Sequence, residues 1–296
     1  MRLSGIAILA ALLLAGCSTV QELTHGNLGA APAATTDDTR RDADKKLAAF
    51  DYPRAEAGYR AVLAKNPTDN AARLGLAESQ LGQRKLDEAR ATFASLSDVS
   101  SYEALAHQGI GLVEVRAGNV DAAIVALKAA VEKNDALWRA WNALGQAYDL
   151  SKNWQVSADA YAHALKNTPD TSFVHNNMGV SLLAQGRYDD ALKEFDGVLK
   201  TNPMLTTART NRQITLALMQ RYPDAVAGMA PEDKARALNN IGYIAMLKGD
   251  YDSAEKYFNQ AMQENPNNKT VQENIDLMQH LKAEAESSGA PGSAKN

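Results

Sequence analysis

Apolar and small residues recur with a helical period between residues 138 and 171. The first stripe consists of Trp141, Leu144, Gly145 and Tyr148. The second consists of Ser157, Tyr161 and Ala164. Each stripe has the spacing of one helix face at about 3.6 residues per turn, so two short amphipathic helices are predicted. Pro169 lacks a backbone N–H donor and has a fixed φ, and it therefore ends the second helix.

The same pattern recurs every 34 residues along the chain. The position of Gly145 is taken in successive units by Ala43, Ala77, Gly111, Gly145 and Gly179. The position of Tyr161 is taken by Tyr59, Phe93, Leu127, Tyr161 and Phe195. Glycine inside a helix costs about 1 kcal/mol relative to alanine, so the small residue needs a packing reason. We predict that the paired helices cross closely there, and that a larger side chain would overpack by about 1–3 kcal/mol.

A helix–turn–helix unit of 34 residues, with Trp-x2-Leu-Gly-x2-Tyr in its first half and a proline near its end, resembles the tetratricopeptide repeat, or TPR. The resemblance covers residues 36–268. It implies an all-α fold, a TPR α-solenoid in which helix–turn–helix repeats stack into a right-handed superhelix. Seven repeats are predicted, starting near Thr36, Asn70, Ala104, Trp138, Ser172, Thr206 and Ala235.

The sixth repeat departs from this spacing. Tyr222 and Ala225 keep the register, but the next equivalent pair, Tyr251 and Ala254, follows after 29 residues. The second helix of this repeat should therefore be shorter by about one and a half turns. Prolines also lie in that segment, so we expect a short or bent helix and a local change in the pitch of the superhelix.

After the last repeat, residues 269–286 predict a helix that caps the open end of the array. Its apolar stripe consists of Val271, Ile275, Met278 and Leu281. Residues 287–296 are rich in serine and glycine and are expected to be a disordered tail.

Residues 1–16 carry one charge before an apolar run and predict a secretory signal peptide, too short for a permanent membrane anchor. The following Leu-Ala-Gly-Cys sequence, which ends at Cys17, resembles the lipobox of bacterial lipoproteins. That resemblance implies that Cys17 receives a diacylglyceryl group and acyl chains such as palmitate. An ordinary signal peptide followed by an incidental cysteine is the alternative. Cys17 is the only cysteine in the chain, and lipidation explains its presence.

The resemblance to lipoproteins also predicts a location. Bacterial lipoproteins with Asp after the lipidated cysteine are kept at the inner membrane, whereas here Ser18 follows Cys17. The implied location is the periplasmic face of the outer membrane, with a lipid anchor. Residues 17–35 then form a flexible tether between this anchor and the repeats.

Composition excludes several classes of function. A formal net charge of −4 gives nucleic acid no basic surface to bind. The histidines, which show no metal-ligand spacing, are His25, His107, His163, His175 and His280. Ser253 and Lys256 match the Ser-x-x-Lys string of acyl-transferring enzymes, but Ala254 between them is the small packing position of a helix. We therefore expect no enzymatic activity, no metal and no cofactor besides the lipid on Cys17.

Function is therefore expected on the surface of the array, and the TPR resemblance implies an inner wall formed by the first helices. The wall residues are predicted to be Asn176, Asn177, Val180, Leu183, Asn211, Ile214, Asn239, Asn240, Tyr243 and Met246. Asparagine amides can hold the backbone of an extended peptide, and the apolar wall residues can receive an amphipathic helix or strand. Alternatively, the asparagines bond to the neighbouring helix and the apolar residues contact the adjacent repeat.

Among lipoproteins made of TPRs, the chain most resembles the TadD family of tight-adherence (Flp) pilus assembly systems. The resemblance rests on residues 176–191 and on their echo at 239–254. It implies a periplasmic scaffold that aids assembly or localisation of the pilus secretin, as a pilotin does. Other TPR lipoproteins scaffold peptidoglycan synthases or hydrolases, or outer-membrane barrel assembly, and these alternatives stay open. In every case the expected partners are other proteins.

Overall fold

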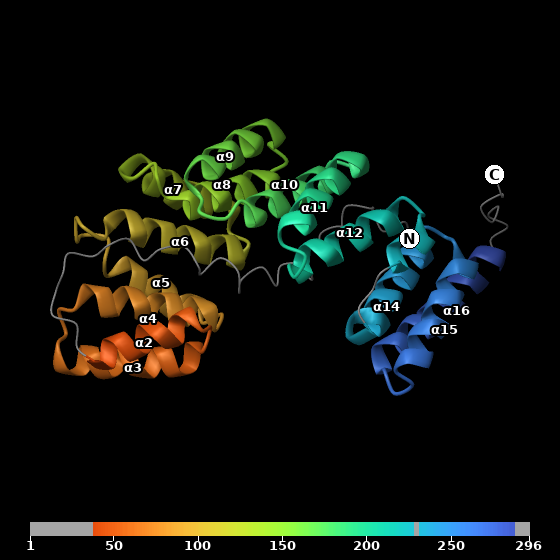
Figure 1. Cartoon of the computed structure of the whole chain (residues 1–296), viewed down its shortest axis with the longest axis horizontal. Coiled ribbons are helices and arrows are strands. Elements are labelled where there is room, and N and C mark those ends of the chain that lie inside the picture. The colour runs from red at the N-terminus through yellow and green to blue at the C-terminus, as the bar shows by residue number, and fades with distance from the viewer. Residues whose placement is uncertain (1–37, 228–230, 288–296) are drawn as a thin grey trace. The chain divides into compact units, whose positions relative to one another are not determined.

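The computed structural model describes residues 38–227 and 231–287, and these residues form helices joined by turns, with no strand among them (Figure 1). This confirms the predicted all-α fold class. The predicted signal peptide, Cys17, the tether and the tail from residue 288 onward lie outside the described residues.

The described helices follow one another in pairs. The first helices are α2 (Asp38–Ala48), α4 (Asn70–Gly82), α6 (Glu103–Ala117), α8 (Trp138–Leu150), α10 (Ser172–Ala184), α12 (Thr206–Leu218) and α14 (Pro231–Leu247). The second helices are α3 (Tyr52–Lys65), α5 (Leu86–Ala94), α7 (Val120–Lys133), α9 (Trp154–Asn167), α11 (Tyr188–Thr201), α13 (Tyr222–Val226) and α15 (Tyr251–Glu264). The last helix, α16 (Lys269–Ser287), has no second helix after it among the described residues.

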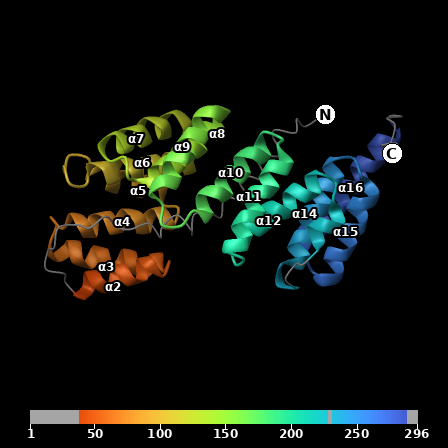
Figure 2. The same ribbon diagram turned by 45° about the horizontal axis from the view of Figure 1, so that its top comes forward.

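The chain forms two compact units, which divide between Ser181 and Leu182. In the first unit α3, α5 and α7 each pack against the first helix of their own pair and against that of the next pair. In the second unit α14, α15 and α16 lie side by side, and α16 contacts both α15 and α14 (Figure 2). It takes the place that the first helix of a further pair would have.

Each first helix ends in one residue with positive φ. Four of these residues are not glycine, namely Phe50, Arg84, Lys152 and Gln220, with φ between 58° and 61°. The other three are Gly118, Gly186 and Gly249, with φ between 75° and 79°. A left-handed residue ends a helix and reverses the chain within a few residues. The repeated turn therefore lets the second helix of a pair fold back on the first, as α3 does on α2 and α15 does on α14.

The close helix crossing predicted from the small residues is confirmed. A Cβ atom added to Gly145 of α8 would lie 2.6 Å from the ring of Tyr161 in α9. One added to Gly242 of α14 would lie 2.8 Å from the ring of Phe258 in α15. The rings of Tyr161 and Phe258 are buried, and each occupies the space that a side chain on the facing glycine would need.

The same ring position also packs against the first helix of the following pair. Tyr59 of α3 lies so close to Gly75 of α4 that an added Cβ would come within 2.2 Å of its ring. Phe93 of α5 faces Gly109 of α6 in the same way, at 2.3 Å. Both rings are fully buried. One side chain thus separates two successive first helices and sets their spacing.

The sixth pair is shortened more than the spacing predicts. Its second helix, α13, has 5 residues, whereas α11 and α15 each have 14. The expected loss of about one and a half turns is too small because the next first helix begins early. This helix, α14, starts at Pro231 instead of near Ala235 and has 17 residues, compared with 13 in α12. Proline at a first helical position has a suitable φ and needs no N–H partner there, which favours the early start.

We expect Gly145→Ala to destabilise the protein by about 1–3 kcal/mol, because the new methyl group collides with the Tyr161 ring. Gly197 in α11 is the matched control, since an added Cβ there meets no atom within 4 Å. Gly197→Ala should stabilise the helix by up to about 1 kcal/mol. Urea unfolding of both variants measures the difference, and equal effects would contradict the close-crossing argument.

A carboxylate also joins the first two pairs. Glu56 of α3 is buried and accepts hydrogen bonds from Arg60, Gln83 and Lys85, each with a donor–acceptor distance of 2.7 Å. Burial alone raises the pKa of Glu56, but the hydrogen bonds from Lys85, Arg60 and Gln83 outweigh burial and lower it to about 2.

The lowered pKa of Glu56 predicts a loss of stability in acid. Because the carboxylate is favoured in the folded state, its contribution is complete above about pH 4.5 and disappears as the pH falls toward 2. Glu56→Gln should therefore show a weaker decline of the unfolding midpoint over this range than the wild-type protein. Glu88→Gln, at an exposed position of α5, is the control for loss of a carboxylate, and identical profiles for all three proteins would refute the prediction.

Candidate functional site

The wall asparagines of the first unit lie within the packing between helices. Asn177 of α10 donates from Nδ2 to Oδ1 of Asn142 in α8, at 3.0 Å. Asn142 is fully buried, and Asn177 is 8% exposed. Asn176 is 1% exposed. The amide of Asn177 therefore joins two successive first helices, as in the alternative raised by the sequence.

The second unit contains the same kind of contact. Asn274 of α16 donates from Nδ2 to Oδ1 of Asn239 in α14, at 2.8 Å, across the same separation of 35 residues as in the pair of Asn142 and Asn177. Asn211 is buried. Asn240 is half-buried, and its side chain makes no hydrogen bond within residues 38–227 and 231–287.

The apolar wall residues likewise comprise a buried group and a half-exposed group. Leu183, Ile214 and Met246 are buried, with exposures of 3%, 6% and 2%. Val180 and Tyr243 are half-exposed. In the second unit, the part of the wall open to a partner therefore consists of Asn240 and Tyr243, which lie one turn apart on α14.

A buried ion pair that was not predicted lies in the first unit, and its carboxylate, Glu78, is in register with the wall residue Val180. Arg139 of α8 donates from both Nη atoms to the two carboxylate oxygens of Glu78 in α4, at 3.1 and 3.3 Å. Both side chains are buried. Nearby, Arg116 donates to the carbonyl of Leu81 at 3.3 Å, and burial lowers the pKa of its guanidinium to about 10. The pair joins α4 to α8, two repeats apart, and is a structural element of the first unit.

No arrangement of groups for catalysis or metal binding stands out in the described part of the chain. Residues 38–227 and 231–287 hold no cluster of three His, Cys, Asp or Glu side chains that could bind a metal ion. Of the histidines, His163 stacks on Trp141, with ring centroids 4.3 Å apart. Asp149 accepts hydrogen bonds from Tyr161 and Ser181 at 2.7 and 2.6 Å, and burial raises its pKa. These groups hold helices together.

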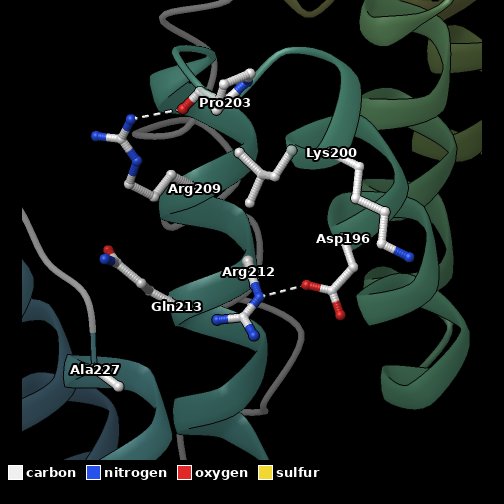
Figure 3. Close-up of a pocket in the computed structure, with 8 residues that line it drawn as sticks. Asp196, Lys200, Pro203, Arg209, Arg212, Gln213 and Ala227 are labelled. Carbon is white, nitrogen blue, oxygen red and sulfur yellow. Dashed lines mark hydrogen bonds and ion pairs between the residues drawn. The ribbon is translucent and has the colours of Figure 1, made fainter.

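A pocket of about 420 Å³ lies in the sixth repeat (Figure 3). We call it the sixth-repeat pocket, and it is lined by Asp196, Leu199, Lys200, Pro203, Arg209, Arg212, Gln213 and Ala227. Its walls come from the second half of α11 and from the first two turns of α12. Figure 3 shows the side chains of Asp196 and Arg212 reaching toward each other from these two helices.

The short helix α13 ends at Val226, and the next residue, Ala227, lines the edge of the pocket. In the other pairs a longer second helix places a ring or a leucine on the small residue of the first helix, as Leu127 does on Gly111. The equivalent position of α12 is Gln213. A large polar residue is tolerated at this place because no ring from a second helix needs the space. The combination of Gln213 with the 29-residue spacing is the sequence signal that could have located the pocket.

The pocket is rich in cationic side chains. Arg212 is paired with Asp196 at 2.5 Å. Arg209 donates to the carbonyl of Pro203 at 2.8 Å and lies 3.6 Å from the carboxylate of Asp233. Lys200 is exposed and has no ion pair within the described residues. Two of the three cations of the lining are thus paired with carboxylates, and Lys200 alone has no carboxylate partner among the described residues.

Stacked helix pairs, spaced by a buried ring against a small residue, define the class of helical-repeat proteins that act by presenting surface. The chain belongs to the tetratricopeptide-repeat family, whose models match residues 46–100, 109–171, 176–227 and 235–268. These repeats mediate protein–protein interactions, and nothing in the family match indicates catalysis. No helix of the described residues is long and apolar enough to span a membrane.

Solved structures support the same fold. A tetratricopeptide repeat protein from Parabacteroides merdae is 17% identical with a TM-score of 0.55, over 82% of this chain and 100% of that one. A thermophilic TPR protein from Thermus thermophilus is 21% identical with a TM-score of 0.53, over 64% and 97% of the two chains. Pseudomonas aeruginosa pilF is 20% identical with a TM-score of 0.51, over 69% and 95%.

The two kinds of wall asparagine should respond differently to truncation. Asn177→Ala leaves the buried amide oxygen of Asn142 without its partner, so we expect a loss of about 1–3 kcal/mol of stability. Asn240→Ala breaks no hydrogen bond and should change stability by less than about 0.5 kcal/mol. Urea unfolding compares the two variants, and an equal loss would show that the Asn142 contact is unimportant.

Proposed function

We propose that this protein is a non-enzymatic scaffold, held by a lipid on Cys17 at the periplasmic face of the outer membrane, that helps to assemble or localise a tight-adherence pilus secretin. The observation that carries the proposal is the combination of a TPR array, a fold that mediates protein–protein interactions, with a Leu-Ala-Gly-Cys sequence ending at Cys17 that resembles a lipobox. The array supplies surface for partners, and the lipid keeps that surface near the membrane.

The physical chemistry of the N-terminal region supports a tethered protein. Each buried CH₂ group of an acyl chain contributes about 0.8 kcal/mol, so several chains together give a firm anchor. A flexible tether of the length of residues 17–35 has a root-mean-square reach of roughly 25 Å. The repeats can thus bind a partner beside the membrane while the anchor stays in place.

The likeness of residues 176–191 and 239–254 to TadD lipoproteins favours the secretin as partner. The likeness to Pseudomonas aeruginosa pilF concerns the fold and does not identify a partner. Scaffolding of peptidoglycan synthases or hydrolases, or of outer-membrane barrel assembly, is the alternative function. These functions require the same anchor and array and differ in the protein that is bound.

Photo-crosslinking in cells from a benzophenone side chain at position 243 tests the function. Tyr243 is half-exposed on α14, and we expect a covalent adduct with the secretin or another pilus component. In the Cys17→Ser background this adduct should be lost and the secretin mislocalised, because the scaffold no longer reaches the membrane. Mass spectrometry of the adduct and fractionation of the secretin are the measurements.

The same crosslinker at Val125, which is 71% exposed on α7, is the control for nonspecific capture. An adduct at position 243 with a cell-wall enzyme or a barrel-assembly protein would replace the pilus pathway and keep the scaffold. Normal secretin assembly in the Cys17→Ser strain would overturn the pilotin role.

A further inference from the structure

Two arginines and one glutamate meet near the end of α4 in the first unit. Glu78 of α4 has both carboxylate oxygens occupied by Arg139 of α8. Arg116 of α6 donates from one Nη to the carbonyl of Leu81, one turn further along α4. It forms no ion pair with any of the described residues. The group therefore carries one positive charge that its single carboxylate does not balance.

Three buried polar atoms of this group lack a hydrogen-bond partner among residues 38–227 and 231–287. They are the second Nη of Arg116, Nε of Arg139 and the hydroxyl of Tyr52. Tyr52 lies here because its ring packs on Gly82, the last residue of α4. Arg139 is 7% exposed and Tyr52 9%. Buried donors without partners are costly and rare in native proteins, and one acceptor from another molecule would satisfy several of them.

The pKa of Arg116 reflects the same imbalance of charge. Burial lowers the pKa of this guanidinium to about 10; Glu78 opposes the shift, whereas Arg139 and Arg84 add to it. The attraction of Glu78 is therefore too weak to offset the loss of hydration. A buried charge without an opposite partner is unfavourable, so a carboxylate would be held more strongly here than at an exposed arginine.

The group lies on the helices that form the predicted inner wall. Glu78 has the register of the wall residue Val180, and Arg116 lies one turn beyond Leu112, the residue of α6 in that register. Glu78 and Arg139 are buried, whereas Arg116 is half-buried. A partner on the wall would therefore reach the group at Arg116.

We propose that Arg116, Nε of Arg139 and the hydroxyl of Tyr52 form a binding site for one acidic side chain of a partner protein. We call it the arginine site. The planar N–H groups of guanidinium match the geometry of a carboxylate, which can accept several hydrogen bonds at once. One carboxylate also balances the one excess charge. The inference rests on the scaffold function proposed above and adds the chemistry by which the first unit would recognise a partner.

Two capped tripeptides test the arginine site. Acetyl-Ala-Glu-Ala-amide, the Glu peptide, carries one carboxylate, and acetyl-Ala-Gln-Ala-amide, the Gln peptide, has nearly the same shape without the charge. Each is titrated into the ¹⁵N-labelled full-length protein, and NMR follows the Nε–Hε resonance of Arg139, assigned with an Arg139→Lys variant. We expect a saturable shift with the Glu peptide, because Nε gains an acceptor. The Gln peptide should bind at least about tenfold more weakly, a factor that corresponds to about 1.4 kcal/mol.

Arg116→Met separates binding from a structural role, since it removes the charge and keeps the apolar stem. We expect the Glu peptide to bind this variant at least about tenfold more weakly. The urea unfolding midpoint should not fall, because an unbalanced buried charge is lost together with the hydrogen bond to Leu81. Lys128→Met removes a charge at an exposed position of α7 and should leave binding unchanged.

An Arg139 resonance that does not move with the Glu peptide, or moves equally with the Gln peptide, would overturn the site. A lower unfolding midpoint of Arg116→Met would identify Arg116 as a cap of α4 and would also overturn it. Tighter binding of sodium acetate than of the Glu peptide would show that a polypeptide cannot enter, and would assign the site to a free anion. Crosslinking from position 243 does not involve these residues, so capture of a secretin there would leave the scaffold function standing if the arginine site fails.

Discussion

The contact between an aromatic ring on one helix and a glycine on another determines most of this structure. Tyr161 can lie flat against α8 because Gly145 has no Cβ, and Tyr59 uses Gly75 in the same way on the following helix. Glycine within a helix lowers stability by itself, so the residue persists only where the buried ring returns more free energy than the glycine costs. The spacing of first helices, and with it every surface they form, depends on this contact.

The sixth repeat shows the consequence of losing this contact between a ring and a small residue. Once α13 is too short to carry a ring, α12 no longer needs a small residue, and Gln213 stands in its place. The change in helix length and the change in residue type have one cause. Beside α12, Arg212 pairs with Asp196 of α11, and Arg209 bonds to the carbonyl of Pro203 and pairs with Asp233 of α14.

Local periodicity explains why the helix pairs were predictable from the sequence and why the site was less so. The registers of Gly145 and Tyr161 locate both helices of a repeat, because in the regular pairs the small residue and the large apolar residue must face each other. The contact between Glu78 and Arg139 joins residues 61 positions apart and leaves no periodic trace. The shortening of α13 was underestimated because spacing reports the sum of two changes, a shorter α13 and an earlier start of α14.

The wall asparagines show that side chains at a repeated position are used first to bond the helices of the array to one another. The amides that could grip a peptide, in Asn177 and Asn239, are used to bond neighbouring first helices. A side chain that recurs in register is under the same packing demand in every repeat, and a buried amide left unpaired would cost about 1–3 kcal/mol. Side chains that recognise a particular partner therefore fit best where the repeat pattern is interrupted or where the array ends. Here those places include the half-exposed Asn240 and Tyr243 on α14.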